Sequence, residues 1–159
     1  MLHQIVHTLE DWKLTILRVM LGCIFFAHGA QKALGWFGGN GFSGTVQYFT
    51  TSMGIPEFFA ILAILAEFAG GLGLIVGLLG RIAAFGIACN MLVAIALVHS
   101  HFGFFMNWTG QQPGEGFEFH LLVLAMTAAV MIGGSGAFSI DLALDRRTHT
   151  HHHARPLPA

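Results

Sequence analysis

Hydrophobic residues gather in four long stretches that contain few polar side chains. Leu, Ile, Val, Phe, Ala and Gly dominate these stretches, which cover residues 14–34, 56–79, 82–100 and 117–134. A helix needs about 20 residues to cross a hydrocarbon core of about 30 Å, so each stretch is long enough for one membrane span. The pattern therefore predicts four transmembrane helices.

The connections between the stretches predict how the helices are arranged. Gly80 and Arg81 leave only a tight turn between the second and third stretches, which favours an antiparallel hairpin. The first connection is too polar and too rich in Gly to span a membrane, but from Ser43 its apolar residues recur at helical spacing. We therefore expect an all-α integral membrane protein, an antiparallel bundle of four transmembrane helices with a short interfacial helix in the first outer loop.

The composition agrees with a membrane protein and leaves no room for a soluble domain. Hydrophobic residues make up 55% of the 159 residues, charged residues only 9%, and the mean hydropathy is +0.70. An ordinary soluble domain carries roughly 25% charged residues. The net charge is -1 and no basic block precedes residue 140, which argues against a nucleic-acid partner. We expect one transmembrane domain over residues 1–142, in contact with the lipid bilayer, and a disordered, His-rich cytoplasmic tail over residues 143–159.

Basic residues near the ends of the spans predict the orientation of the bundle. One side carries only Lys32, and the other side carries Lys13, Arg18, Arg81, Arg146 and Arg147. The positive-inside rule therefore places both termini in the cytoplasm. Arg18 lies one turn inside the first helix, from where it either snorkels to the interface or anchors the segment around Asp141.

Three further residues lie deep in the stretches. Cys23 and Cys89 belong to different stretches and form no C-x-x-C pair, so we interpret them as small core residues. A membrane thiol oxidoreductase is disfavoured, because its chemistry needs paired, accessible thiols. Asn90 is expected to hydrogen-bond a neighbouring helix or to carry function, because hydrocarbon offers it no partner.

The ionisable residues within the stretches are crowded toward the outer end of the predicted bundle. His28, Gln31 and Lys32 form one stripe on the first helix, since they are three and four residues apart. The end of the third stretch and the start of the fourth bring four more residues into the same layer: His99, His101, Glu118 and His120.

Glu67 lies deeper, about 17 Å along the second helix at 1.5 Å per residue. An ionisable side chain near the bilayer centre costs at least ~2.5 kcal/mol unless it is paired or hydrated, so a site is the first hypothesis. Lys32 and the histidines are the cations that can pair with Glu67. We take His28, Lys32 and Glu67 as candidate catalytic residues. The candidates for cofactor binding are His28, Gln31, Lys32, Glu67, His99, His101, Glu118 and His120.

Four interpretations of this cluster are open. The polar residues could form a structural clamp between helices. An imidazole and a carboxyl could hydrogen-bond a quinone head group and exchange protons with it, because such groups titrate near neutral pH. His28 facing His99, His101 or His120 could supply two axial ligands to haem, or His and Glu ligands to a metal ion. The cluster could also line a path for protons or a small solute.

The spacing of the histidines is only a weak signal for metal. His99 and His101 are two residues apart, whereas two imidazoles on one helical face are four apart. The tail run from Thr148 to His153 could bind metal by composition, but an engineered or incidental tail is the simpler interpretation. We therefore assign no metal ligands.

Several motifs of the chain resemble the DoxX family over residues from about 14 to 142. The strongest are the His-Gly-x-x-Lys end of the first helix and the Gly-x-Gly-x-x-Ser-hydrophobic-Asp segment after the fourth. The matching runs are Leu17-Arg18-x-x-x-Gly22, Phe25-Phe26-Ala27-His28-Gly29-x-Gln31-Lys32, Glu67-x-x-Gly70, Gly77-Leu78-x-x-Arg81 and Gly134-x-Gly136-x-x-Ser139-Ile140-Asp141.

The resemblance implies a small four-helix protein of the bacterial or archaeal cytoplasmic (inner) membrane. The founding members of the family are membrane subunits of an archaeal thiosulfate:quinone oxidoreductase, and other members are linked to oxidative-stress complexes. By this resemblance, the polar positions of the family correspond to His28, Lys32, Glu67 and Arg81.

We therefore predict a membrane subunit of a quinone-linked redox complex, in which Glu67 or a histidine relays protons and Lys32 holds a carbonyl oxygen of the quinone. His28 and either His99 or His101 would complete the surroundings of the head group. The main alternative is a noncatalytic scaffold or anchor whose outer loops dock a partner protein. A solute or proton pathway ranks below both, because the chain shows no inverted repeat. Its stripes of Gly and Ala suit packing within one chain or in a homo-oligomer.

Overall fold

The computed structural model describes residues 6–153 of the chain, with side chains as far as Arg147. Its helices are α2 (Trp12–Leu34), α3 (Gly41–Gln47), α4 (Glu57–Val76), α5 (Gly80–Leu97), α6 (Glu118–Gly133) and α7 (Ile140–His153). Residues 6–153 contain no β-strand, which confirms the predicted all-α fold. The side chains of the His-rich run in the tail lie outside the described part.

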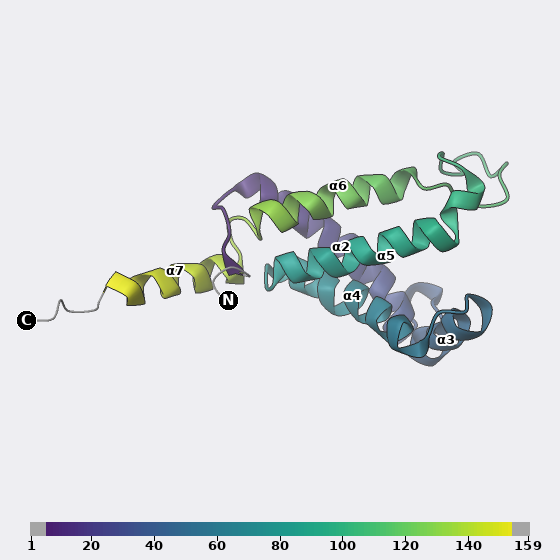
Figure 1. Ribbon diagram of the computed structural model, residues 1–159, viewed down its shortest axis with the longest axis horizontal. Helices are drawn as coiled ribbons and strands as arrows, with labels where there is room; N and C mark the ends of the chain where they lie inside the picture. Colours follow the sequence, from purple (N-terminus) through teal and green to yellow (C-terminus); the bar gives the residue numbers. More distant parts are fainter. Residues whose placement is uncertain (1–5, 154–159) are drawn as a thin grey trace, which may run out of the picture.

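The helices α2, α4, α5 and α6 form the bundle, and consecutive ones run in alternating directions (Figure 1). α4 packs between α2 and α5, and α6 packs mainly on α5. α2 crosses the bundle obliquely (Figure 1). We call the end that holds residues 6–11 and the start of α7 the terminal end, and the end that holds α3 and residues 98–117 the loop end.

The helix lengths agree with four spans, although the boundaries differ slightly from the predicted ones. α2, α4 and α5 are long and apolar enough to cross a membrane, and α6 is a shorter apolar helix of 16 residues. The second span ends at Val76, before residue 79, and the third begins at Gly80. The reason is a turn in which Gly77 (φ 71°) and Leu79 (φ 52°) are left-handed.

The inner faces of the four helices form one apolar core, whereas their outer faces expose large apolar side chains. The buried core consists of Leu21, Phe25, Leu74, Ala84, Ile87, Met91, Val123 and Val130. Exposed side chains around the bundle include Met20, Leu65, Phe85, Leu92 and Leu122. Such an apolar belt is rare on soluble monomers and suits contact with lipid.

The predicted interfacial helix is present as α3, which begins at Gly41 and so starts two residues before Ser43. It continues into a π-helical segment, η2 (Tyr48–Ser52). Thr45 of α3 is buried, and its Oγ1 donates to the carbonyl oxygen of Lys32 at 3.2 Å. This contact holds α3 against the end of α2.

The structure confirms the prediction for Asn90 but not the one for the two cysteines. Asn90 donates through Nδ2 to the carbonyl oxygen of Ala63 at 2.9 Å, which confirms the predicted contact with a neighbouring helix. Cys23 and Cys89 are free and exposed, so the expectation that they are core residues is wrong. Each lies on an outward face of its helix.

Arg18 is buried at the terminal end, so the snorkelling interpretation is wrong. Its guanidinium donates to five backbone carbonyls, of Leu74 (2.6 Å), Ile75 (2.7 Å), Ser135 (2.5 Å), Ala137 (3.4 Å) and Phe138 (2.8 Å). The arginine therefore ties α2 to the end of α4 and to the segment that leads to Asp141. This is the anchoring alternative that the sequence left open.

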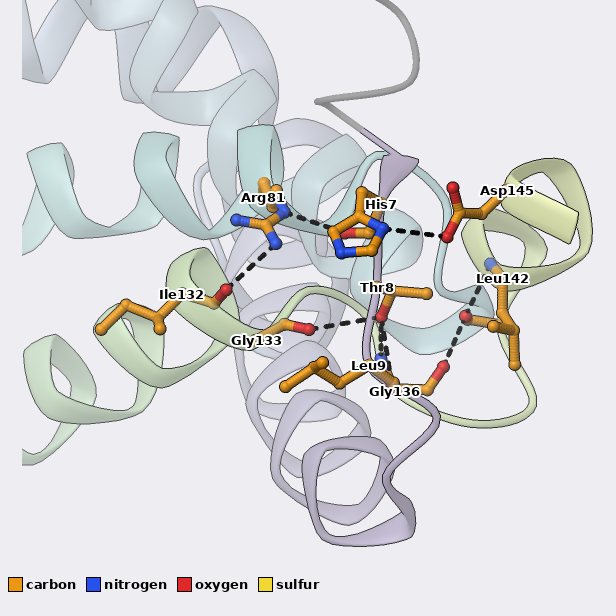
Figure 2. Close-up of polar contacts among 10 residues, drawn as sticks. His7, Thr8, Leu9, Arg81, Ile132, Gly133, Gly136, Leu142 and Asp145 are labelled. Carbon is orange, nitrogen blue, oxygen red and sulfur yellow. Dashed lines mark hydrogen bonds and ion pairs between the residues drawn. The ribbon is translucent and has the colours of Figure 1, made fainter. Parts of the chain in front are cut away.

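The N-terminal segment lies across the terminal end and joins α5, α6 and α7 (Figure 2). Arg81 donates through Nε to the carbonyl oxygen of His7 at 3.2 Å, and Nδ1 of His7 lies 3.1 Å from Oδ2 of Asp145. Oγ1 of Thr8 accepts the N–H of Gly136 at 2.7 Å. These contacts hold the start of α7 in place.

α7 continues to His153, whereas the composition predicts a disordered tail from residue 143. The first turns of α7 pack against the rest of the protein, because Leu142 and Asp145 are buried. The N–H of Leu142 also bonds Oγ of Ser139 at 3.1 Å, which starts the helix. The backbone is thus helical as far as His153, and the disorder of residues 143–159 stays a prediction.

Candidate functional site

Lys32 and Glu67 form an ion pair between α2 and α4. Nζ of Lys32 lies 2.5 Å from Oε2 of Glu67, and the two side chains are 26% and 9% exposed. Lys32 lies in the last turn of α2, and Glu67 lies in the middle of α4. Lys32 was one of the cations that the sequence offered as a partner for Glu67, and the two side chains are in direct contact.

A close approach of the two helices makes this contact possible. A Cβ at Gly29 would overlap the backbone of Phe68 and Glu67, so only glycine fits at this position. A Cβ at Gly71 would likewise overlap the backbone of Phe26. Because Gly29 lies about one turn before Lys32, this contact brings the lysine within reach of Glu67.

His28 and Gln31 lie beside the ion pair without joining it. The imidazole of His28 is exposed, and its ring lies 6.4 Å from that of Phe25, centroid to centroid. Gln31 is half-buried. Within residues 6–153, neither side chain forms a hydrogen bond or an ion pair. His28 is therefore open to whatever molecule covers this face of α2.

His99 and His120 form a second group, between the end of α5 and the start of α6. Their ring centroids are 4.0 Å apart, at an interplanar angle of 42°. Nδ1 of His99 lies 2.8 Å from the carbonyl oxygen of Glu115. His120 is buried, and its Nδ1 has no hydrogen-bond partner in the described part of the chain. Nδ1 of His120 is thus a buried polar atom that lacks a partner among the described residues.

This histidine pair does not fit a haem or a metal ion held between its two rings. When two imidazoles bind one metal ion from opposite sides, each nitrogen lies about 2 Å from the metal. The two nitrogens are then about 4 Å apart, and the ring centroids are farther apart still. The rings of His99 and His120 are already in direct contact. Among the described residues, no three side chains of His, Cys, Asp or Glu are grouped so that they could hold a metal ion.

Glu118 organises the loop that precedes α6. Its Oε1 accepts the N–H of Met106 and the indole N–H of Trp108, each at 3.1 Å. An open groove of about 400 Å³ lies beside this carboxylate. Its walls are mainly aromatic and apolar, from Phe104, Trp108, Phe119, Leu121 and Leu122.

The eight predicted site residues therefore do not converge on one point. Lys32 and Glu67 meet between α2 and α4, while His99, His120 and Glu118 lie where α5 gives way to α6. Among residues 6–153, no hydrogen bond, ion pair or ring contact joins these two groups. His101 is exposed and takes part in neither.

The polar residues that make the most contacts lie instead at the terminal end. Arg18 is one of them, and Arg81 is another, with bonds to the carbonyl oxygens of Met131 and Ile132. Asp141 is also buried there. The Gly-x-Gly-x-x-Ser-hydrophobic-Asp segment was the available signal for this network, but it does not reveal which helices the aspartate contacts.

Similarity to known proteins extends over most of the chain. The family model described as DoxX matches residues 13–100, which include Lys32 and Glu67. Inner membrane protein YqjF of Escherichia coli (strain K12) is 33% identical over 139 residues, covering 87% of this chain and 97% of that protein. "Putative oxidoreductase CatD" of Bacillus subtilis (strain 168) is 32% identical over 126 residues, covering 79% and 82%. No solved structure matches the chain.

Proposed function

Because the chain belongs to the DoxX family, we propose that it is the membrane subunit of a quinone-linked redox complex and binds a quinone head group beside Lys32 and Glu67. Like its Escherichia coli relative, whose name places it in the inner membrane, it is a multi-pass membrane protein. The name of the Bacillus subtilis relative, which describes an oxidoreductase, favours a redox role.

The observation that carries the proposal is the ion pair between Lys32 and Glu67. Removing two charges from water costs several kcal/mol per ion, and their mutual attraction often fails to compensate. Ionisable residues inside membrane spans are therefore typical of functional sites. The side chain of Lys32 is 26% exposed, so part of it remains accessible to a ligand.

The two side chains provide the groups that a quinone head group requires. A bound quinone would supply two-electron chemistry, taking two electrons from a redox group of a soluble partner protein and two protons to become the quinol. The ammonium of Lys32 donates a hydrogen bond to a carbonyl oxygen and stabilises negative charge on it. The carboxyl of Glu67, now paired with Lys32, holds or releases a proton at Oε2.

His28 extends this site along α2. It lies one turn before Lys32 and is exposed, which places an imidazole on the surface that a ligand entering from the membrane would cross. An imidazole can accept and donate protons near neutral pH. In this proposal His28 exchanges protons with the site. His99 and His120 contact each other, and within the described residues no contact joins them to Lys32 or Glu67.

Quinone binding to the full chain tests the proposal. The purified protein in detergent is titrated with decylubiquinone and with a short-chain menaquinone analogue, and bound quinone is measured after extraction. Lys32→Gln and Glu67→Gln should each weaken binding at least about tenfold, because a hydrogen bond to a charged group contributes about 1.5–3 kcal/mol. The double variant, which leaves no unpaired charge, should fold and should also bind weakly.

The same helices provide matched controls. Lys13→Gln in α2 and Glu57→Gln in α4 remove the same charges from exposed positions and should leave quinone binding unchanged. A wild-type protein that is folded but binds neither quinone would overturn the proposal. That result would favour the noncatalytic scaffold, in which the ion pair only locks α2 to α4.

A further inference from the structure

The carboxylate of Glu118 lines the groove and is held in place by hydrogen bonds. Both donors that hold the carboxylate bond to Oε1, from Met106 and Trp108. In the part of the chain that the structure describes, Oε2 has no partner. The carboxylate is thus held in one orientation while half of its hydrogen-bonding capacity stays free.

The floor of the groove is continuous with the apolar surface of α6. Leu121 and Leu122, which line the groove, are 42% and 66% exposed. They follow Glu118 along a helix that is part of the membrane bundle, so an apolar chain lying on them would point into the hydrocarbon region. Trp108 also lines the groove and is 85% exposed, and aromatic residues are common at the level of lipid head groups.

The charge around the groove favours a cation. Residues 98–121 contain no Lys or Arg, but they contain Glu115 and Glu118. Within the described residues, neither glutamate forms an ion pair. A phosphate group alone would be repelled, whereas an ammonium group could bond Oε2 and also lie over the face of the Trp108 indole.

We propose that this groove binds a phospholipid with a primary ammonium head group, of the phosphatidylethanolamine type. The ammonium group donates a hydrogen bond to Oε2 of Glu118 beside the Trp108 ring, and one acyl chain lies on Leu121 and Leu122. The site is separate from the ion pair of Lys32 and Glu67.

Native mass spectrometry of the full chain tests this proposal. Protein in micelles is mixed with equal amounts of phosphatidylethanolamine and phosphatidylglycerol with identical acyl chains. Wild-type protein should retain phosphatidylethanolamine with about 2–5-fold enrichment, as expected for one solvent-accessible ion pair. Glu118→Gln should bring the ratio to that of the mixture, because glutamine can still accept from Trp108 and Met106 but lacks the charge.

Glu57→Gln is the matched control, since Glu57 lies in the first turn of α4 as Glu118 lies in the first turn of α6. The enrichment should survive this substitution. Circular dichroism should show the same helix content in all three proteins. The proposal is wrong if wild-type protein retains both lipids equally, if Glu118→Gln keeps the enrichment, or if Glu57→Gln loses it to the same extent.

Discussion

Asp141 accepts the backbone N–H of Gly80, with Oδ2 of the aspartate 3.0 Å from the nitrogen. Its Oδ1 accepts the N–H of Leu79 at 2.9 Å, and Oγ of Ser135 donates to Oδ2 at 2.6 Å. The first N–H groups of a helix have no partner within that helix and carry partial positive charge. The carboxylate of Asp141, which follows the fourth span in the sequence, thus caps the third span, α5.

We expect Asp141→Asn to lower the free energy of unfolding by about 1–2 kcal/mol, because the amide loses the charge and turns an N–H₂ group toward one of its donors. Thermal unfolding in detergent measures this change. Asp11→Asn is the comparison, since Asp11 caps α2 through a single bond to the N–H of Lys13 at an exposed site. Equal losses in both variants would contradict the role given to Asp141.

Arg18→Lys should destabilise the protein strongly although it keeps the charge. An ammonium group cannot reproduce the forked geometry that reaches five carbonyl oxygens, and several of these would lose their donor. We expect a loss of about 3 kcal/mol, or no folded protein. The control Arg147→Lys changes an exposed arginine of α7 and should be neutral. Similar melting temperatures for both variants would refute this prediction.

Substitution by alanine should destabilise the protein at one glycine of the bundle and be tolerated at another. Gly29→Ala pushes a methyl group into the backbone of Phe68, which should separate α2 from α4 and cost about 1–3 kcal/mol. A Cβ at Gly70 would lie at an ordinary 3.6 Å from Cβ of Ala83, so Gly70→Ala should be neutral or gain up to about 1 kcal/mol from helix propensity. Thermal unfolding of both variants in the same detergent measures these changes, and equal losses of stability would contradict the prediction.

A double-mutant cycle should detect coupling between Lys32 and Glu67. Each single substitution to Gln leaves one buried charge unpaired, and we expect a cost of about 3 kcal/mol, at the low end for buried pairs because Lys32 is partly exposed. The double variant should lose less than the sum of the two. Unfolding free energies measured in detergent give the coupling, and strictly additive losses would show that the pair contributes no interaction energy.

The positive-inside rule predicts that the terminal end faces the cytoplasm. In a background with Cys23→Ser and Cys89→Ser, Thr51→Cys in η2 should react with a membrane-impermeant maleimide in intact cells. Lys13→Cys should react only after the membrane is opened. Both positions are exposed, so accessibility within the protein does not limit labelling. The reverse pattern would invert the orientation.

The features that follow from local pattern were predicted well. The four apolar stretches became α2, α4, α5 and α6, and Asn90 found a carbonyl on a neighbouring helix. The sequence also offered Lys32 as a partner for Glu67, but it did not choose between this lysine and the histidines. Errors arose where the face of a helix mattered: Cys23 and Cys89 point outward, and Arg18 points inward.

By itself, the sequence determined that this protein is a bundle of apolar helices with ionisable residues near one end, because hydropathy and helical spacing are properties of neighbouring residues. Only the tertiary structure decided that these residues separate into an ion pair on α2 and α4 and a histidine pair beside α6. It also decided that the segment after α6 returns to cap α5. The partner of a side chain depends on which helices pack together, and that is set by contacts such as Gly29 against Phe68, between residues far apart in the chain.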